Sequence, residues 1–218
     1  MPFFQKIECG KGWGGIWKIT ESPDELCRML PLGEYHRGQA ARYASPKRRL
    51  EYLAVRMLVY ALTGEELPIS YRVSGRPFFA GCPLQLSISH TSGYAAVLFS
   101  EEYETGIDIE AFSDRIVRLK ERLIGPDEKA DTTYEMLLHW SAKEAVFKIL
   151  DEDGIDFRTD MTVEGLHCPA SAVRPDGEGD FSLFYHLQDG KAGMFPVHYE
   201  TSADFVLTSG NVEKVAFG

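Results

Sequence analysis

Two short motifs in this sequence place carboxylates where they could bind a metal ion. The first is the stretch Gly106-Ile107-Asp108-Ile109-Glu110. Successive side chains of an extended strand point to opposite faces, so Asp108 and Glu110 would share one face and the two isoleucines the other. On a buried strand these carboxylates make half of a metal site, whereas on an edge strand they would form only a solvated acidic face.

The second motif is Trp140-Ser-Ala-Lys143-Glu144-Ala-Val-Phe147-Lys148. Its numbered positions recur at helical spacing, which predicts one shared helix face with Glu144 between two lysines. A solvated Glu144–Lys148 pair would stabilise the helix by only about 0.3 kcal/mol. The interleaved aromatic rings indicate a partly enclosed face, where charged groups are costly unless they meet a metal ion or a ligand.

Charge is distributed unevenly along the chain. The formal net charge of −10 argues against nucleic acid or an anionic membrane as the main partner. The segment from His36 to Leu58 nevertheless contains one acid, Glu51, among many cations. Such a local basic patch favours a small, phosphate-rich ligand or an acidic patch on a partner. The basic residues of this segment are Arg37, Arg42, Lys47, Arg48, Arg49 and Arg56.

Three of these cations, Lys47, Arg48 and Arg49, fall in the first turn of a helix that we expect to begin after Ser45. Cations are unfavourable beside the positive end of a helix dipole, so the cluster needs a bound anion or free solvation. A bound phosphate and a solvated basic turn both meet this need, and the sequence does not separate them.

Two further segments carry groups suited to ligand binding. Arg76 places an always-charged guanidinium in a tight turn, and Ser89, His90 and Thr91 end a strand with two hydroxyls and an imidazole. A histidine at a strand end is more often a hydrogen-bonded structural residue. Neither segment identifies a site by itself.

These groups must be positioned by a regular set of helices and strands. Ser22 and Glu25 have the spacing of a capping box that would open a first helix. Periodic apolar residues predict further helices, and alternating apolar residues bounded by turn signals predict strands. The expected helices cover 46–63, 114–124 and 133–150. The expected strands lie within 3–20 and at 68–73, 77–80, 84–90, 94–99, 106–110, 159–166, 180–187, 193–200 and 203–209.

The order of these elements repeats coarsely along the chain. A long helix followed by several strands occurs in residues 46–100 and again in 133–209. We therefore expect an α+β fold of two similar α/β halves related by a pseudo-twofold axis, divided into residues 1–102 and 103–218. Such a fold would build its ligand cleft between the halves, from both of them.

Composition sets the wider bounds. A chain of 218 residues with 44% hydrophobic content can bury a large core. We expect a cytoplasmic protein, because the N-terminus lacks a signal-peptide pattern and no apolar run reaches membrane-spanning length. The cysteines have no CxxC spacing and suit reduced thiols better than a zinc site. They are Cys9, Cys27, Cys82 and Cys168.

Four segments, taken in chain order, resemble the motifs of the 4′-phosphopantetheinyl transferases. They are Gly75-Arg76-Pro77, Leu86-Ser-Ile-Ser89-His90-Thr91, Gly106-Ile-Asp108-Ile-Glu110 and Trp140-Ser-Ala-Lys143-Glu144-Ala-Val-Phe-Lys148. The resemblance covers residues 40–150. Length and tandem architecture are similar to the surfactin-synthetase-activating type, in which one chain contains two similar halves.

This resemblance implies an enzyme. It would transfer the 4′-phosphopantetheine group of coenzyme A to a serine of an apo acyl or peptidyl carrier protein and release adenosine 3′,5′-bisphosphate. Mg²⁺ would be its metal cofactor, coenzyme A its co-substrate, and a monomer its expected state, since the cleft would form within one chain.

The resemblance also implies roles for the two motifs. Asp108, Glu110 and Glu144 would hold Mg²⁺, and such an all-carboxylate set suits a hard cation that takes phosphate oxygens as its remaining ligands. Glu144, or a water molecule that it orients, would accept the serine proton. Lys148 would neutralise charge on the pyrophosphate and the leaving group. The expected catalytic residues are Glu144, Lys148 and Asp108.

Coenzyme A would be bound from both halves of the chain. Arg76, which stands where relatives often have lysine, and His90 would contact its phosphates. One or more of Lys47, Arg48 and Arg49 would meet its 3′-phosphate. The full expected cofactor-binding set is Lys47, Arg48, Arg49, Arg76, Ser89, His90, Thr91, Lys143 and Lys148.

Two alternatives stay open. With water in place of serine, the same carboxylates would make a Mg²⁺-dependent hydrolase of a nucleotide or of the coenzyme A pyrophosphate. A catalytically silent relative would bind carrier proteins or coenzyme A without reacting.

Overall fold

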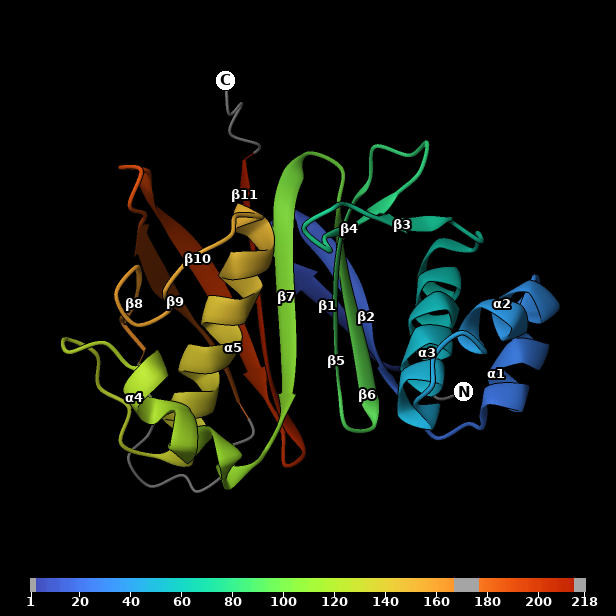
Figure 1. Cartoon of the computed structure of the whole chain (residues 1–218), viewed down its shortest axis with the longest axis horizontal. Coiled ribbons are helices and arrows are strands. Elements are labelled where there is room, and N and C mark those ends of the chain that lie inside the picture. Colours follow the sequence, from blue (N-terminus) through green and yellow to red (C-terminus); the bar gives the residue numbers. More distant parts are fainter. Residues whose placement is uncertain (1–2, 167–176, 214–218) are drawn as a thin grey trace.

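The structure is a computed structural model that describes residues 3–166 and 177–213. Its main elements are two antiparallel sheets, each with one long helix packed against it (Figure 1). The first part of the chain forms β1 (Phe3–Cys9), β2 (Gly12–Lys18), α1 (Pro23–Met29), α2 (Gly33–Ala40), α3 (Pro46–Thr63), β3 (Ile69–Tyr71), β4 (Pro77–Phe79), β5 (Gln85–Thr91) and β6 (Tyr94–Ser100). The second part forms β7 (Tyr103–Ala111), the 3₁₀ helix η1 (Asp114–Leu119), α4 (Lys120–Leu123), α5 (Thr133–Leu150), β8 (Met161–Glu164), β9 (Gly177–His186), β10 (Ala192–Thr201) and β11 (Phe205–Glu213).

The two larger sheets share one feature of strand order. The first has the order β1-β2-β6-β5 and the second β7-β11-β10-β9-β8, while β3 and β4 form a separate pair. In each larger sheet the final strand returns to pair with the strand that precedes the long helix, β6 with β2 and β11 with β7. The predicted α+β class is confirmed. The division into 1–102 and 103–218 stays a prediction.

Capping boxes mark the starts of α1 and α5. The Ser22 hydroxyl accepts from the Glu25 backbone N–H at 3.3 Å, and the Glu25 carboxylate accepts from Ser22 N at 2.7 Å, so the expected capping box forms. Thr132 and Glu135 form a second box at the start of α5. Among the described residues, no helix is long and apolar enough to cross a membrane.

The segment 114–124 differs from the prediction of one helix. It forms the six-residue 3₁₀ helix η1 followed by the single turn of α4. Two adjacent β-branched residues, Ile116 and Val117, lie in this segment, and such residues lose side-chain freedom in an α-helix. The Gly125-Pro126 pair then ends it.

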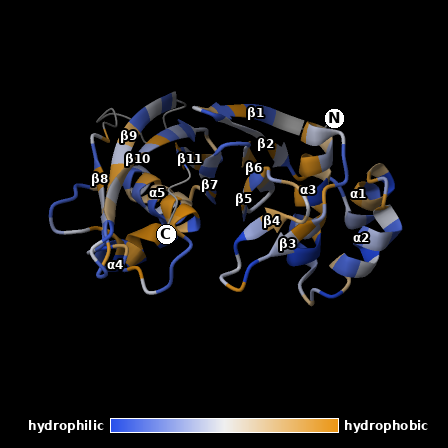
Figure 2. Cartoon of the chain, turned by 90° about the horizontal axis from the view of Figure 1, so that it is seen from above, coloured by the Kyte–Doolittle hydropathy of each residue, from blue (hydrophilic) through white to orange (hydrophobic). Residues whose placement is uncertain are grey.

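Three apolar cores hold the layers together. One lies between α3 and the first sheet, and a second lies between α5 and the second sheet. The third joins the two sheets, and Ile107 and Ile109 of β7 pack in it against Ile16 and Leu98. The isoleucines of the first motif therefore face the inter-sheet core, which turns Asp108 to the opposite face of β7. Both views of the molecule place β5 and β7 between α5 and α3 (Figures 1 and 2).

Hydroxyl groups on alternate residues of β5 connect it to β7. Ser87 Oγ accepts from the Ile107 backbone N–H at 3.0 Å, and Thr91 Oγ1 accepts from the Ala111 N–H at 3.0 Å. Between them, Ser89 Oγ donates to Asp108 Oδ1 at 2.8 Å. Both strands are the edges of their sheets. These contacts satisfy donors that an open edge would leave unpaired, and they fix the two sheets to each other.

Gly106 allows a close approach between α5 and β7. A Cβ atom at this position would lie 2.0 Å from the Ala145 carbonyl oxygen and 2.8 Å from Ile149 Cγ1. A backbone atom of a packed helix cannot move aside cheaply, so any side chain here would push α5 away from the strand that carries Asp108.

We expect Gly106→Ala to destabilise the protein by about 2–3 kcal/mol, the cost of overpacking a tight contact. The matched control is Gly38→Ala in α2, where a Cβ would meet nothing within 4 Å. That change should be neutral or slightly stabilising, because alanine favours a helix. Urea unfolding of both variants measures the difference, and equal stabilities would show that α5 can shift without cost.

Candidate functional site

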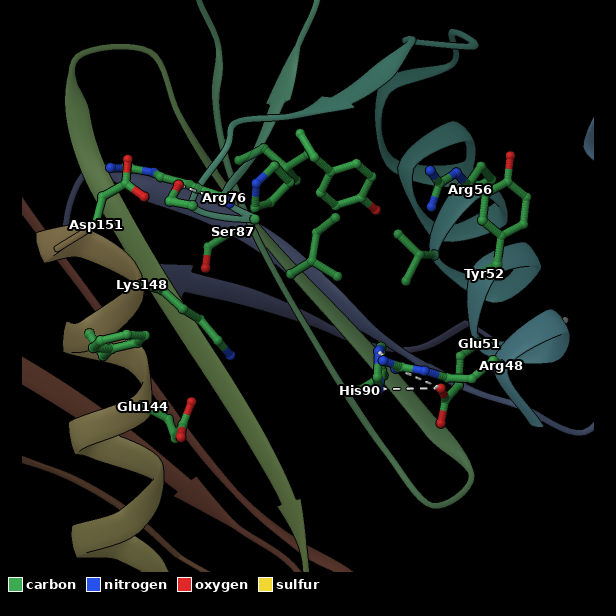
Figure 3. Close-up of a pocket in the computed structure, with 18 of the residues that line it drawn as sticks. Arg48, Glu51, Tyr52, Arg56, Arg76, Ser87, His90, Glu144, Lys148 and Asp151 are labelled. Atoms are coloured by element: carbon green, nitrogen blue, oxygen red, sulfur yellow. Dashed lines mark hydrogen bonds and ion pairs between the residues drawn. The ribbon is translucent and has the colours of Figure 1, made fainter. Parts of the chain in front are cut away.

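A cavity of about 430 Å³ lies between the first and second parts of the chain. Its walls come from α3 and β5 on one side and from α5 on the other (Figure 3). Glu144 and Lys148 project from α5 toward the cavity, and Arg48, Glu51 and His90 lie across from them. A cleft of this size and position is typical of a small-molecule site.

Asp108 is buried beside this cavity with one oxygen unsatisfied. Its Oδ1 accepts from Ser89 Oγ and from Lys148 Nζ, each at 2.8 Å. Its Oδ2 is buried and has no hydrogen-bond partner in the described part of the chain. Buried carboxylate oxygens are nearly always paired, so this oxygen has the capacity to accept a cation or a further hydrogen bond.

The carboxylates of Glu110 and Glu144 are half-buried, and the negative charge of Asp108 acts on both of them. Burial and the charge of Asp108 raise the pKa of Glu110, which also accepts from Trp140 Nε1 at 2.8 Å. Burial, together with the charges of Asp108 and Glu110, raises the pKa of Glu144 to about 7, against the opposing effect of Lys148. The three predicted metal ligands therefore repel one another.

These carboxylates fit a hard divalent cation by their chemistry. In the ranges 3–166 and 177–213, no three His, Cys, Asp or Glu side chains are already gathered around a metal position. Oxygen-only donors and an unpaired buried oxygen nevertheless suit Mg²⁺, whose charge would relieve the repulsion among Asp108, Glu110 and Glu144. Gathering all three groups requires side-chain movement.

Lys148 supplies the positive charge on the α5 side. Its Nζ donates to the Ile107 carbonyl oxygen at 2.9 Å and to Asp108 Oδ1 at 2.8 Å. Its side chain remains 26% exposed and lines the cavity. The sequence prediction that Glu144 and Lys148 share a face is confirmed, since both side chains point toward the cavity (Figure 3).

Lys143 does not reach this site, in contrast to the sequence prediction. It is fully buried, and its Nζ donates to Glu128 Oε2 at 2.6 Å and to the carbonyl oxygens of Leu123 and Phe157 at 2.8 Å. Neighbouring residues of a helix point about 100° apart, so Lys143 cannot face the same way as Glu144. Its role is to anchor α5 to the segments on its far side.

Glu128 is the centre of this anchor, and the sequence analysis did not identify it. Its Oε1 accepts from Val163 N at 2.7 Å and lies 3.3 Å from His139 Nδ1. Burial by itself raises the pKa of Glu128, but hydrogen bonds from His139 and Lys143 outweigh it and lower the pKa to about 2. A single glutamate after a Gly-Pro turn gives no sequence signal for such a contact.

The cationic cluster of α3 reaches the cavity through Arg48. Arg48 Nη1 lies 2.8 Å from His90 Nε2, and both residues line the cavity. Burial lowers the pKa of His90, Glu51 opposes the shift, and Arg48 and Lys148 add to it. Lys47 and Arg49 are not among the lining residues. Arg49 instead donates from Nε to the Tyr43 carbonyl oxygen at 2.7 Å.

Arg76 lines the cavity but is held by protein groups. Its Nη2 forms an ion pair with Glu104, and its Nη1 donates to the Ile149 carbonyl oxygen at 3.2 Å. Arg72 makes a parallel contact to Asp151 at 2.9 Å. Both arginines therefore fasten the segment before β4 to the end of α5. The contact between Arg76 and a phosphate stays a prediction.

Ser89 and Thr91 are placed differently from the expected cofactor contacts. Their hydroxyls are used in the junction between β5 and β7, and neither residue lines the cavity. Ser87, two residues earlier on the same strand, does line it. The motif could not show this, because the partner of an edge strand is not visible in its own sequence.

The comparisons with known proteins point to one class of enzyme. No protein-family model matches the chain. A 94-residue segment, 43% of the chain, is 38% identical to curated proteins named 4′-phosphopantetheinyl transferase, which supports a relationship to that superfamily. The two relatives are both called AcpT, from Salmonella typhimurium (strain LT2) and Salmonella typhi. The match spans 42% of their length, less than half of each relative.

The buried anchor yields a stability prediction. Replacing Lys143 with methionine leaves Glu128 buried without its cation, and we expect a loss of about 3–5 kcal/mol. The exposed Lys129→Met is the matched control and should change stability by less than about 0.5 kcal/mol. In the double variant Lys143→Met/Glu128→Leu, the loss should be smaller than the sum of the single losses. Equal stability of the two lysine variants would contradict the anchor.

The same anchor predicts acid sensitivity. The pKa of Glu128 is about 2 in the folded protein against an ordinary value of 4.5. A lowered carboxyl pKa stabilises the fold at pH values above 4.5, and this stabilisation is lost as the pH falls toward about 2. Denaturant unfolding at several pH values should show a shallower acid loss in Glu128→Gln than in the wild type. If the free energy of unfolding falls equally with decreasing pH in both proteins, Glu128 is not the source of the acid sensitivity.

Divalent-cation binding can be tested without an activity assay. We expect Mg²⁺ to raise the Tm of the wild type. At a Mg²⁺ concentration a hundred times its Kd, the free energy of unfolding should increase by about 2.7 kcal/mol. The rise should be larger at pH 8 than at pH 6, because the pKa of Glu144 is about 7 and protons compete with the metal at the lower pH. Asp108→Asn should abolish the rise, whereas the exposed cavity variant Asp153→Asn should keep it. A Tm rise that survives in Asp108→Asn would place the cation elsewhere.

Proposed function

We propose that this protein transfers the 4′-phosphopantetheine group of coenzyme A to a serine of an apo acyl or peptidyl carrier protein, in a Mg²⁺-dependent reaction that releases adenosine 3′,5′-bisphosphate. One observation carries the proposal. Asp108 keeps one buried oxygen, Oδ2, unpaired, and its other oxygen accepts from Lys148, which lines the cavity with Glu144 opposite Arg48 and His90. The partial similarity to the AcpT proteins supports the same reaction class.

The two sides of the cavity suit the two anionic groups of coenzyme A, its pyrophosphate and its 3′-phosphate. Lys148 and the carboxylates would receive the pyrophosphate together with a divalent cation. Arg48 and His90 would receive the 3′-phosphate, since a guanidinium binds phosphate oxygens through two parallel hydrogen bonds. Which of Arg48, Lys47 and Arg49 makes that contact is proposed from cavity lining alone, which favours Arg48.

The reaction needs positioning and charge neutralisation more than covalent catalysis. The serine oxygen of the carrier forms a bond to the β-phosphorus of coenzyme A, and the bond from that phosphorus to the adenosine 3′,5′-bisphosphate oxygen breaks. Glu144 accepts the serine proton, and Lys148 stabilises the negative charge on the leaving phosphate. Mg²⁺ held by Asp108, Glu110 and Glu144 would supply further neutralisation of the pyrophosphate.

A second part of the proposal concerns the architecture of the protein. We propose that residues 1–102 and 103–218 are the two related halves of a tandem enzyme of the surfactin-synthetase-activating type, acting as a monomer. The equivalent pairing of β6 with β2 and of β11 with β7 supports a pseudo-twofold relation between them. The cavity draws on both halves of one chain, which is what such a monomer requires.

Intact-mass spectrometry of an apo carrier protein tests the reaction. With coenzyme A and Mg²⁺, we expect the carrier to gain one phosphopantetheine, and a chelator should stop the gain. Asp108→Asn and Glu144→Gln should lower the rate about a hundredfold or more, because each removes a group that acts in the transition state. The control Asp153→Asn should react at the wild-type rate.

Other results of the same experiment would distinguish the hydrolase and the silent binder from the transferase. Consumption of coenzyme A in the absence of any carrier would indicate the hydrolase and overturn the transferase. Binding of coenzyme A with neither reaction would indicate a silent binder. Full activity in Asp108→Asn or Glu144→Gln would contradict the assigned mechanism even if transfer occurs.

A further inference from the structure

Glu51 is a buried acid surrounded by cations at the Arg48 end of the cavity. Its side chain is only 6% exposed. Its Oε2 lies 3.2 Å from Arg48 Nη1 and 3.6 Å from His90 Nδ1, and its Oε1 lies 3.6 Å from Lys47 Nζ. One carboxylate therefore joins two residues of α3 and one of β5, elements that meet at the cavity wall (Figure 3).

The helix and the strand would not hold these cations by themselves. Lys47 and Arg48 lie in the first turn of α3, where the helix dipole disfavours positive charge. Without Glu51, Lys47 and Arg48 would repel each other, and these flexible side chains would extend into solvent. In the structure, Arg48 Nη1 lies 2.8 Å from His90 Nε2, and Glu51 Oε2 lies within 3.6 Å of both residues.

We propose that Glu51 is a positioning residue that holds Arg48 and His90 ready for the terminal phosphate of the nucleotide end of coenzyme A. The inference rests on the proposed function, because it takes the ligand to be coenzyme A. Groups already fixed in the binding geometry lose little freedom when the anion arrives, which raises affinity without any contact from Glu51 itself.

Two simpler roles for Glu51 predict different changes in the affinity for coenzyme A. If Glu51 only balanced charge, its negative charge would oppose an entering phosphate, and its removal would tighten binding. If Glu51 only supported the fold, its removal would weaken every ligand equally. Positioning predicts a loss confined to ligands that carry the terminal phosphate.

Isothermal titration with coenzyme A and with 3′-dephospho-coenzyme A separates these roles. In Glu51→Ala we expect the affinity for coenzyme A to fall about tenfold, the value of one charge-assisted hydrogen bond, while that for 3′-dephospho-coenzyme A stays within about twofold. Glu51→Gln keeps an acceptor oxygen for Arg48 and should lose less. Glu65→Ala, an exposed acid beyond the far end of α3, is the control and should match the wild type. In the transfer assay, the KM for coenzyme A should rise in Glu51→Ala while kcat is kept.

Two results overturn the inference while the proposed function stands. Tighter or unchanged binding of coenzyme A in Glu51→Ala and Glu51→Gln would assign only a charge-balancing role. An equal loss for both ligands would assign only a structural role, and Glu51→Gln decides the question if the alanine variant does not fold. A wild-type protein that binds neither ligand would instead overturn the proposed function, and this inference with it.

Discussion

The structure depends on the burial of Asp108 at the junction of β5 and β7. This carboxylate accepts from Ser89 of one sheet and from Lys148 of the helix on the other, so one side chain connects three elements. A buried charge is tolerated only where it is paired, which fixes β5, β7 and α5 relative to one another. The same contacts leave Oδ2 unpaired beside a cavity. Stability and the proposed chemistry therefore rest on one residue.

Buried charges on both sides of α5 and at the wall of the cavity have counter-charges nearby. Glu128 and Lys143 anchor the far side of α5, Asp108 and Lys148 form the near side, and Glu51 gathers the cations of α3. The anchor has its hydrogen bonds satisfied, whereas the near side has an unpaired oxygen and carboxylates with raised pKa values. An unpaired carboxylate oxygen and two carboxyl groups with raised pKa values thus lie together at or beside the cavity, as expected of a functional site.

Much of the fold and part of the candidate site could be predicted from the sequence, where local rules apply. The apolar period and the turn residues placed α5 at 133–150 and β7 around Asp108, and helical spacing brought Glu144 and Lys148 to one face. Predictions that needed long-range partners were less accurate. The spacing did not show that Lys143 turns toward Glu128, or that Ser89 and Thr91 bind β7. Glu51 was noticed only as the lone acid among cations, because its contact with His90 spans two elements. Cys168 lies outside the described residues.

The most direct test of the central claim is a crystal structure of the protein with coenzyme A and Mn²⁺, whose anomalous signal locates the metal. We expect the metal among Asp108, Glu110 and Glu144, the pyrophosphate beside Lys148, and the 3′-phosphate against Arg48 and His90. Coenzyme A bound outside the cavity between α3 and α5, or a metal ion away from Asp108, would contradict the claim that this cavity is the active site.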